Sequence, residues 1–425
     1  MKRRPQKPSR SDSPPRSPSP SRRPTAPRGR SEQRPRPSTE PPREYGPPSD
    51  EEQWADDDED DFEVREEDLY SLGVLKTPKA EQHLIDVWKP AAAPVQSALC
   101  LSLGRAQFAA HVAAAFPKAS VRCNFLDLYA AEESRDFHRK TAPNLEITCQ
   151  TDLPEGEVDL CAVPVTRGGE AELNREWFQQ AYQRLKIGGT FLASSDNFED
   201  TWLRDELGKL FTHTERHVRR GGVVYTAQKK TPLKRLRDFS AEFAFRDQGR
   251  LVQAVSRPGV FSHRKLDLGS RALLEVVEVR AGDKVLDVGC GSGVVGLAAA
   301  LRADGVSVEA IDSNCRAVEA ARRGAEKNGL TAFTARQEAA GRITEPGTFD
   351  VAAGNPPYYS QFKIANLFLL AAHAALKPGG RVYMVTKHSD WYVARMSQLF
   401  EGVEVVPSRE YVVVKAIQKS AGVSS

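Results

Sequence analysis

The chain of 425 residues contains no run of about 18 apolar residues, the length that a membrane-spanning helix requires. No apolar segment follows its basic N-terminus, so we expect no secretory signal. Its six cysteines form no Cys-x-x-Cys pair and no histidine cluster accompanies them, so we expect reduced, mostly buried thiols and no zinc site. These cysteines are Cys100, Cys123, Cys149, Cys161, Cys290 and Cys315. The absences predict a cytoplasmic protein without a membrane or metal partner, and we expect a monomer.

Composition separates the first 68 residues from the rest of the chain. Residues 1–48 hold 14 of the 28 prolines and thirteen Lys or Arg against four acids, whereas residues 49–68 hold thirteen acids and one Arg. Neither block has a hydrophobic period, and such a segment buries too little apolar surface to offset the entropy lost on folding. We therefore predict a disordered tail over residues 1–68. The remaining residues carry a net charge of +6, which permits a nucleic-acid partner without requiring one.

Patterns typical of strands alternate with patterns typical of helices on both sides of a basic connector, residues 229–237. A helical lead-in, predicted over Asp68–Lys89, precedes the first alternating region, and the second region begins near Glu242. This alternation predicts an α/β fold with parallel, doubly wound sheets. We accordingly divide the chain into a tail over residues 1–68, a first domain over 69–238 and a second domain over 239–425.

The two alternating regions look like two copies of one unit. Asp159 precedes Gly188 by 29 positions, and Asp350 precedes Gly379 by the same 29. Each interval runs from a predicted strand through a predicted helix to a Leu-Lys-x-Gly-Gly turn. Two unrelated α/β domains with common turn chemistry are the alternative. We favour duplication and refer to the two regions as the first and second copy.

The copies differ where a doubly wound sheet carries its chemistry. The second copy has Asp-Val-Gly-Cys-Gly-Ser-Gly over Asp287–Gly293, where the first has Leu-Ser-Leu-Gly-Arg-Ala-Gln over Leu101–Gln107. Further on, the second copy has Asn-Pro-Pro-Tyr over Asn355–Tyr358, where the first has Val-Pro-Val-Thr over Val163–Thr166. The first copy is therefore predicted to be degenerate.

Three glycines in alternate positions follow a predicted buried strand, Lys284–Val288, and precede a predicted helix. They are Gly289, Gly291 and Gly293. Glycine lets a backbone bend tightly and approach a ligand without a Cβ in the way, and open α/β sheets bind ligands beyond the carboxyl ends of their strands. Together with Gly296 the loop also fits G-x-G-x-x-G, so a dinucleotide site is an alternative.

Polar side chains at neighbouring strand ends favour S-adenosylmethionine as the cofactor. Asp287 can engage the ammonium of that molecule, and Asp312, at the end of the next predicted strand, can accept hydrogen bonds from ribose hydroxyls. Gln337, at the end of the strand after that, is our candidate for contact with the adenine amino group. Each residue also has a structural alternative: Asp287 as a turn-forming residue, Asp312 as the N-cap of the following helix, and Gln337 as a solvated loop residue.

Asn355, Pro356, Pro357 and Tyr358 form the most specific motif in the sequence. An exocyclic base amine is a poor nucleophile because its lone pair is delocalised into the ring. The Asn355 side-chain oxygen and the Pro356 carbonyl can accept its N–H bonds, and the fixed φ of proline can hold both acceptors rigid. Tyr358 can stack on the extruded base. The motif predicts methyl transfer to a planar nitrogen; a loop with a surface tyrosine is the alternative.

With these motifs the sequence resembles the bacterial ribosomal RNA guanine-N2 methyltransferases, of the small-subunit methyltransferase C and large-subunit methyltransferase G type. Asp287–Gly293 and Asn355–Tyr358 carry the resemblance, together with Arg257–Ser262, Leu266–Ser270 and Arg409–Ala416. It covers residues 95–420, strongly over 256–418.

The resemblance implies two tandem methyltransferase domains, of which the first has lost cofactor binding and the second is catalytic. It implies that Phe261 and its neighbours line the cofactor site, and that the degenerate copy helps to hold the catalytic domain and RNA. The implied substrate is guanine N2 in ribosomal RNA, and the implied partner is ribosomal RNA or a ribosomal subunit.

Other functions stay open at this stage. A protein glutamine-N5 methyltransferase uses the same Asn-Pro-Pro-Tyr motif, because a planar amide presents the same N–H geometry. An adenine-N6 methyltransferase is a further candidate. An RNA-binding assembly factor with a vestigial cofactor site belongs to a different class, against which the intact glycine loop argues. A nicotinamide dehydrogenase is disfavoured, because no substrate domain with a catalytic His or Lys is evident.

Overall fold

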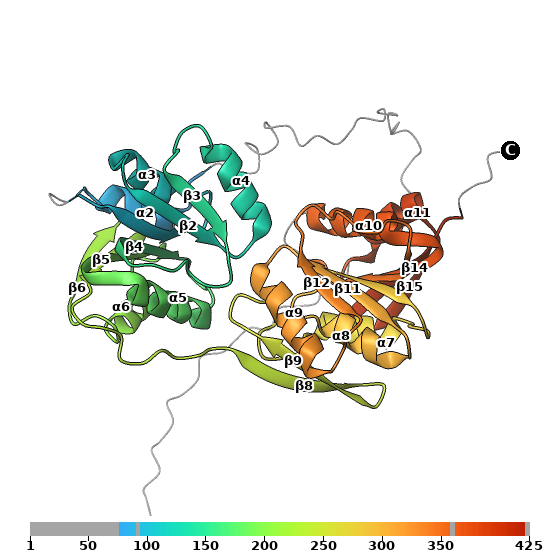
Figure 1. The fold of residues 1–425 in the computed structure, drawn as a ribbon. Helices are drawn as coiled ribbons and strands as arrows, with labels where there is room; N and C mark the ends of the chain where they lie inside the picture. Colours follow the sequence, from blue (N-terminus) through green and yellow to red (C-terminus); the bar gives the residue numbers. More distant parts are fainter. Residues whose placement is uncertain (1–75, 91–93, 358–361, 421–425) are drawn as a thin grey trace, which may run out of the picture. The chain divides into compact units, whose positions relative to one another are not determined.

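Two seven-stranded sheets follow one another along the chain in the computed structural model, which describes residues 76–90, 94–357 and 362–420 (Figure 1). Both sheets belong to one compact unit. The tail predicted over residues 1–68 lies outside the described residues, as does Tyr358. Among the described residues, no helix combines the length and apolar character needed to cross a membrane.

The first sheet has the strand order β3-β2-β1-β4-β5-β7-β6, in which β7 alone runs antiparallel to the other strands. Its strands are β1 (Ser97–Leu101), β2 (Ser120–Phe125), β3 (Leu145–Cys149), β4 (Val158–Val165), β5 (Leu185–Ser195), β6 (Thr214–Arg219) and β7 (Gly222–Gln228). Its helices are α2 (Lys79–Val87), α3 (Gln107–Ala115), α4 (Leu128–His138), α5 (Ala171–Arg184) and α6 (Trp202–Leu207).

The second sheet repeats this order as β12-β11-β10-β13-β14-β16-β15. Its strands are β10 (Lys284–Val288), β11 (Ser307–Asp312), β12 (Phe333–Gln337), β13 (Phe349–Gly354), β14 (Leu376–Thr386), β15 (Phe400–Ser408) and β16 (Tyr411–Gln418). Its helices are α7 (Leu268–Val276), α8 (Val294–Arg302), α9 (Cys315–Lys327), α10 (Lys363–Ala375) and α11 (Ser389–Leu399). A separate hairpin, β8 (Ala241–Asp247) with β9 (Arg250–Ser256), precedes it. The predicted fold class, with two tandem doubly wound regions, is confirmed.

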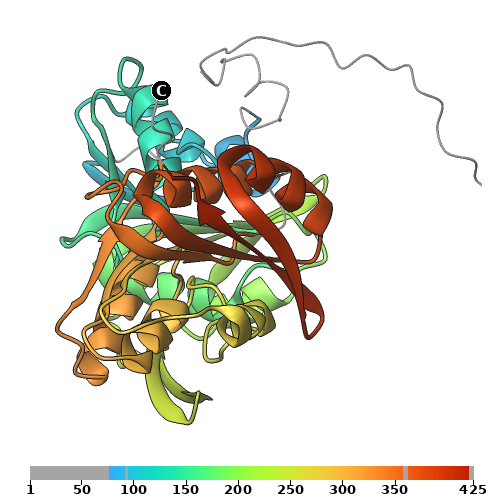
Figure 2. The same cartoon turned by 90° about the vertical axis from the view of Figure 1, so that its right-hand side faces the viewer.

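Helices cover both faces of each sheet, which explains why the central strands carry buried apolar residues on both faces. In β10, Val285 belongs to the cluster under α7 and α8, whereas Leu286 and Val288 belong to the cluster under α10 and α11. Figure 2 shows α10 and α11, in red, on one face of the second sheet and the yellow and orange helices on the other. In β1, alternate residues divide between two clusters in the same way.

The strand registers identify which residues of the first copy stand where the second copy carries its polar groups. Phe125 ends β2 as Asp312 ends β11, and Cys100 holds the fourth position of β1 as Asp287 holds the fourth position of β10. Apolar or uncharged residues therefore occupy the positions of both predicted cofactor carboxylates. The degeneracy predicted for the first copy follows from these exchanges.

The two copies meet at the turns that follow β2 and β11, and the contact is reciprocal. The Leu128 N–H donates to the Ser313 carbonyl (2.9 Å), and the Cys315 N–H donates to the Leu126 carbonyl (2.8 Å). Each donor is the first residue of a helix, Leu128 of α4 or Cys315 of α9. Each acceptor lies two residues before the first residue of its own helix, Leu126 before α4 and Ser313 before α9. Equivalent turns thus bond to each other about an approximate two-fold axis.

A buried guanidinium lies at this contact. Arg316 has no exposed surface. Its Nη1 donates to a carboxylate oxygen of Glu176 at 2.8 Å and to the Pro258 carbonyl at 2.6 Å. Its Nε donates to the Thr151 carbonyl at 2.8 Å, and the guanidinium carbon lies 4.3 Å from the centre of the Trp177 ring. The first copy supplies three of these four partners.

We expect Arg316→Met to lower the free energy of unfolding by about 3 kcal/mol, because it removes a buried cation from a carboxylate that stays buried. The value lies at the lower end of the usual range because Arg257 still pairs with Glu176. Urea denaturation of the full chain measures the change. Arg280→Met is the control, since its exposed pair with Glu278 spans 3.8 Å, and its effect should stay within about 0.5 kcal/mol. Equal stabilities of Arg316→Met and wild type would contradict this account.

Candidate active site

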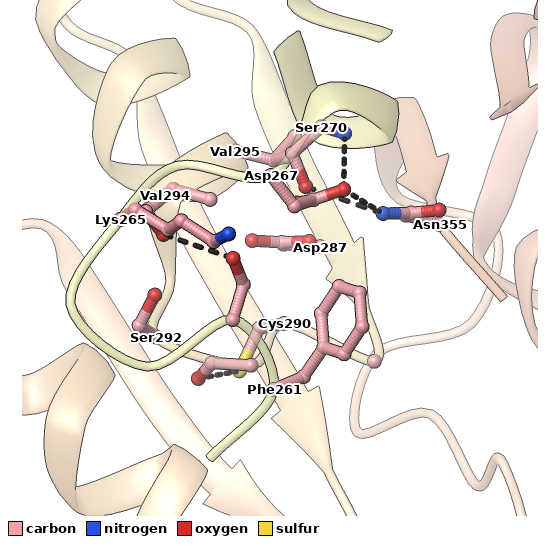
Figure 3. A pocket seen from close by; sticks show the side chains of 13 residues that line it. Phe261, Lys265, Asp267, Ser270, Asp287, Cys290, Ser292, Val294, Val295 and Asn355 are labelled. Atoms are coloured by element: carbon pink, nitrogen blue, oxygen red, sulfur yellow. Dashed lines mark hydrogen bonds between the residues drawn. The ribbon is translucent and has the colours of Figure 1, made fainter. Parts of the chain in front are cut away.

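A pocket opens beyond the carboxyl end of β10, between the loop that follows this strand and the segment that precedes α7 (Figure 3). Asn355, directly after β13, closes one side. The lining residues are Phe261, Ser262, Lys265, Asp267, Ser270, Asp287, Gly289, Cys290, Gly291, Ser292, Val294, Val295 and Asn355. The pocket lies where an open α/β sheet places its ligands.

The three positions of the loop require glycine for different physical reasons. All have positive φ, at +68° for Gly289, +54° for Gly291 and +78° for Gly293. A Cβ at Gly289 would collide with the Phe368 ring, and one at Gly293 would lie 2.8 Å from the Cβ of Ala321. Only at Gly291 would a Cβ meet nothing within 4 Å. Packing against the protein itself therefore accounts for two of the glycines, and Gly293 does not line the pocket.

Asp287 is a buried carboxylate in the pocket wall, with 2% of its surface exposed. One oxygen accepts the Gly296 N–H at 2.8 Å. Burial raises the pKa of Asp287 to about 7, and the nearby Asp312 carboxylate acts in the same direction. A carboxylate in such a place gains electrostatic energy from any cationic ligand that enters the pocket.

Asp312 supports the glycine loop from behind. Its two carboxylate oxygens accept the backbone N–H groups of Gly291 and Asn314, each at 2.8 Å. Burial raises its pKa to about 6. The N-cap of α9 is Asn314, whose side chain accepts from the Arg316 N–H, so the capping alternative for Asp312 is wrong. Asp312 is not among the residues that line the pocket.

Gln337 ends β12, but its amide points into the contact between the copies. Its Nε2 donates to the Ser313 carbonyl at 2.9 Å and contacts the Cys149 sulfur at 3.0 Å. Cys149 ends β3, the strand equivalent to β12. Gln337 does not line the pocket, and the solvated-loop alternative is also wrong because the side chain has partners on both copies.

The amide of Asn355 is held in one orientation. Its Nδ2 donates to Asp267 Oδ1 at 3.1 Å and to Ser270 Oγ at 3.3 Å, as Figure 3 shows. These bonds leave the amide oxygen as an acceptor beside the pocket. Pro356 is buried behind it and Pro357 is half-buried.

The residues that orient Asn355 were not predicted from the sequence. Asp267 caps α7 by accepting the Ser270 N–H at 3.0 Å, and this cap fixes the carboxylate that Asn355 needs. A Cβ at Gly269 would lie 3.1 Å from both polar atoms of the Asn355 amide, so only glycine leaves that amide undisturbed. The available signal was an Asp three residues before a Ser at a helix start.

Phe261 lies in the pocket wall with 68% of its surface exposed. Lys265, from the same segment, adds to the wall a cation that was not predicted from the sequence. Within the described ranges, no group of three His, Cys, Asp or Glu side chains is arranged to hold a metal ion.

The second copy matches a known family. Residues 252–415 fit the family model described as the methyltransferase small domain. A Bacillus subtilis protein, the uncharacterised YbxB, is 31% identical over 182 residues, which cover 41% of this chain and 90% of that protein. The chain belongs to the methyltransferase small-domain family.

Two further relatives carry more specific names. The ribosomal RNA small subunit methyltransferase C of Chromohalobacter salexigens is 40% identical over 138 residues, or 31% of this chain and 40% of the relative. The ribosomal RNA large subunit methyltransferase G of Pseudomonas syringae pv. tomato is 31% identical over 172 residues, or 39% of this chain and 46% of the relative. The second copy is similar to both proteins, although the chain spans less than half the length of either relative.

The likeness of fold extends over both copies. The T. thermophilus 16S rRNA N2 methyltransferase, solved with AdoMet and guanosine, superposes with a TM-score of 0.69 and 23% identity. The match covers 81% of this chain and 93% of that one. At this identity the match shows the fold alone, and that likeness of fold includes both copies.

We expect Asp287→Asn to stabilise the ligand-free protein above neutral pH. Since burial raises the folded pKa to about 7, above the value of about 3.9 for an unfolded aspartate, wild-type stability falls as the pH rises between those values. The amide removes this loss, so the variant should gain about 1–3 kcal/mol at pH 8 and nothing below about pH 4. Thermal unfolding across this pH range measures the difference.

Asp350→Asn is the matched control and should behave in the opposite way. Burial raises the Asp350 pKa, but the Lys377 side chain and the Lys284 N–H outweigh this and lower it. Its stabilisation is therefore present above about pH 4 and is lost as the pH falls through the folded pKa. Parallel pH curves for Asp287→Asn and Asp350→Asn would contradict the assignment.

Proposed function

We propose that the second copy binds S-adenosylmethionine and methylates an exocyclic amine of an RNA base, most specifically guanine N2 in ribosomal RNA. The observation that carries the proposal is the fixed amide of Asn355. Its nitrogen is bonded to Asp267 and Ser270, and its oxygen is left to accept at the mouth of a glycine-loop pocket.

The pocket residues fit the charge and shape of that cofactor. Asp287 offers the ammonium a carboxylate whose pKa is raised by burial and which a cation would restore to the ionised form. Gly291 leaves open space beside its backbone, and the exposed Phe261 ring lines the same pocket. Asp312 remains our candidate for binding the ribose hydroxyls, and Gln337 for binding the adenine amino group. Asp312 would accept through the carboxylate lone pairs that the Gly291 and Asn314 N–H groups leave unused. The cofactor supplies a methyl group on a positively charged sulfur.

Asn355 acts on the nucleophile. Its oxygen and the Pro356 carbonyl accept the two N–H bonds of the amine, which aims the nitrogen lone pair at the methyl group. Because Asp267 and Ser270 fix the amide beforehand, no reorganisation is needed when substrate binds. Tyr358, which lies outside the described residues, is proposed to stack on the base. The amine sheds its proton after transfer, so no general base is required.

The names of the relatives support RNA as the substrate. The C- and G-type relatives are named as ribosomal RNA methyltransferases, and the T. thermophilus structure contains guanosine. Protein glutamine is the second candidate, since an amide would meet Asn355 in the same way. We therefore propose ribosomal RNA or a ribosomal subunit as the partner and the cytoplasm as the location. We also propose a monomer, because each copy already occupies the contact surface of the other.

The full chain should transfer labelled methyl groups from S-adenosylmethionine to unmodified ribosomal RNA or to subunits. Mass spectrometry of digested nucleosides should identify N2-methylguanosine, and Asn355→Ala should reduce its formation about 100-fold with little loss of cofactor affinity. N6-methyladenosine would correct the base, and label on a glutamine-containing protein alone would replace RNA as substrate. Cofactor binding without any transfer would favour the assembly-factor alternative.

Gly269→Ala should lower turnover about tenfold, because a Cβ 3.1 Å from the Asn355 amide displaces its oxygen by a few tenths of an ångström. Stability should not fall, since alanine is the better helix former. Gly208→Ala is the control: it also lies at a helix end, but its Cβ would make only ordinary contacts of 3.4 Å or more. Wild-type turnover in Gly269→Ala, with both melting temperatures unchanged, would remove Gly269 from the site.

A further inference from the structure

Residues 257–265, the Phe261 wall of the pocket, form a strained segment that contacts both copies. Ser262 and Arg264 are both in the left-handed region, at φ +55° and +74°, which non-glycine residues adopt at a cost. Within the wall, the Ser262 hydroxyl donates to the Lys265 carbonyl at 3.1 Å. Ser256, at the end of β9, contacts His263 Nδ1 at 2.7 Å and accepts the Arg264 N–H at 2.9 Å. A conformation of this kind persists only where surrounding contacts impose it.

The first copy supplies such contacts along the whole segment. At its start, Arg257 donates to Glu176 from Nε at 2.9 Å and to Asp152 from Nη1 at 3.2 Å. The side chains of Arg257 and Glu176 are 14% and 8% exposed, whereas that of Asp152 is 51% exposed. Arg316 of the second copy, which is buried against Glu176 and Thr151 of the first, donates to the next carbonyl, that of Pro258. The root of the wall is therefore tied to the first copy.

Glu170, at the N-terminus of α5, holds the middle of the segment. Its carboxylate accepts the Gly259 N–H at 2.9 Å. Gly259 has φ +88°, and a Cβ there would lie 2.8 Å from Leu126 of the first copy. Its carbonyl accepts from Asn314, the N-cap of α9. Gly259, two residues before Phe261, is thus fixed between the two copies.

Glu172, in the first turn of the same helix, holds the far side of the wall. Its carboxylate forms a two-point pair with Arg264, at 3.0 and 3.1 Å, and lies 3.3 Å from His263 Nε2. The paired groups are part-exposed, so the bond contributes modestly to stability. It does, however, fix the residue whose backbone is strained, and the carboxylates therefore bracket Phe261 on both sides.

We propose that Glu170 and Glu172 of the degenerate copy are positioning residues that hold the Phe261 wall of the cofactor pocket in its binding conformation. The inference rests on the proposed function for its ligand, but the conformation of the wall can be measured without one. It gives the first copy a role in ligand binding that none of its own strand ends can perform.

The test combines hydrogen exchange with cofactor binding in the full chain. In Glu170→Ala/Glu172→Ala, the amides of residues 258–265 should exchange about tenfold faster in the ligand-free protein, and the Kd for S-adenosylhomocysteine should rise about fivefold. The melting temperature should change little, because both side chains are part-exposed surface partners. Glu206→Gln is the control, since it breaks ion pairs with Arg175 and Lys209 in the same copy without touching the wall.

A charge swap separates positioning from general destabilisation. Glu172→Arg should loosen the wall, and adding Arg264→Glu should restore slow exchange and most of the affinity. Unchanged exchange and affinity in the double alanine variant, or no recovery in the swap, would overturn the proposal. If the wild type bound no S-adenosylhomocysteine while exchange still responded to these changes, the proposed function would fail and the structural role of the carboxylates would stand.

Discussion

The guanidinium of Arg316 sets the main constraint on the molecule. A fully buried cation is stable only where carboxylate and carbonyl oxygens replace its water, and here the first copy supplies most of them. The Trp177 ring covers one face. The second copy therefore could not bury this residue alone without leaving an unpaired charge. The duplicated chain behaves as one unit because this charge needs both halves.

The same turn connects the contact between the copies to the pocket. Arg316 lies in the first turn of α9, which Asn314 caps, and the Asn314 N–H in turn bonds to Asp312. Asp312 holds the Gly291 N–H, so the glycine loop rests on a turn that the first copy fixes. On the other side of the pocket, α7 begins at the Asp267 cap that orients Asn355. Two capped helix starts thus define the positions of the ligand loop and the acceptor.

Elements with strong local patterns were predicted well from the sequence. The strand expected over Lys284–Val288 was found with those bounds, because a short apolar run between charged and glycine residues leaves little choice of ends. The spacing of 29 residues between equivalent Asp and Gly positions anticipated the repeated strand order. The glycine loop, Asp287 and Asn355 lie together because they stand at or just beyond the carboxyl ends of β10 and β13, which are neighbouring parallel strands.

Contacts between the copies could not be predicted, because no periodicity records them. Gln337 ends its strand as expected, but its amide turns towards Cys149 of the other copy. Asp267 shows only as a helix cap in the sequence, and its bond to Asn355 spans 88 residues. The β8–β9 hairpin was likewise not separated from the second region, since alternation alone does not show which strands pair.

We propose that the second copy alone binds the cofactor and that the first copy supports it. Equilibrium dialysis of the full chain against labelled S-adenosylmethionine tests this most directly, because it counts sites. The account predicts one molar equivalent bound per chain, displaced by S-adenosylhomocysteine and lost in Asp287→Ala, while the equivalent change in the first copy, Cys100→Ala, leaves it intact. Two equivalents, none, or a single site that survives Asp287→Ala would contradict it.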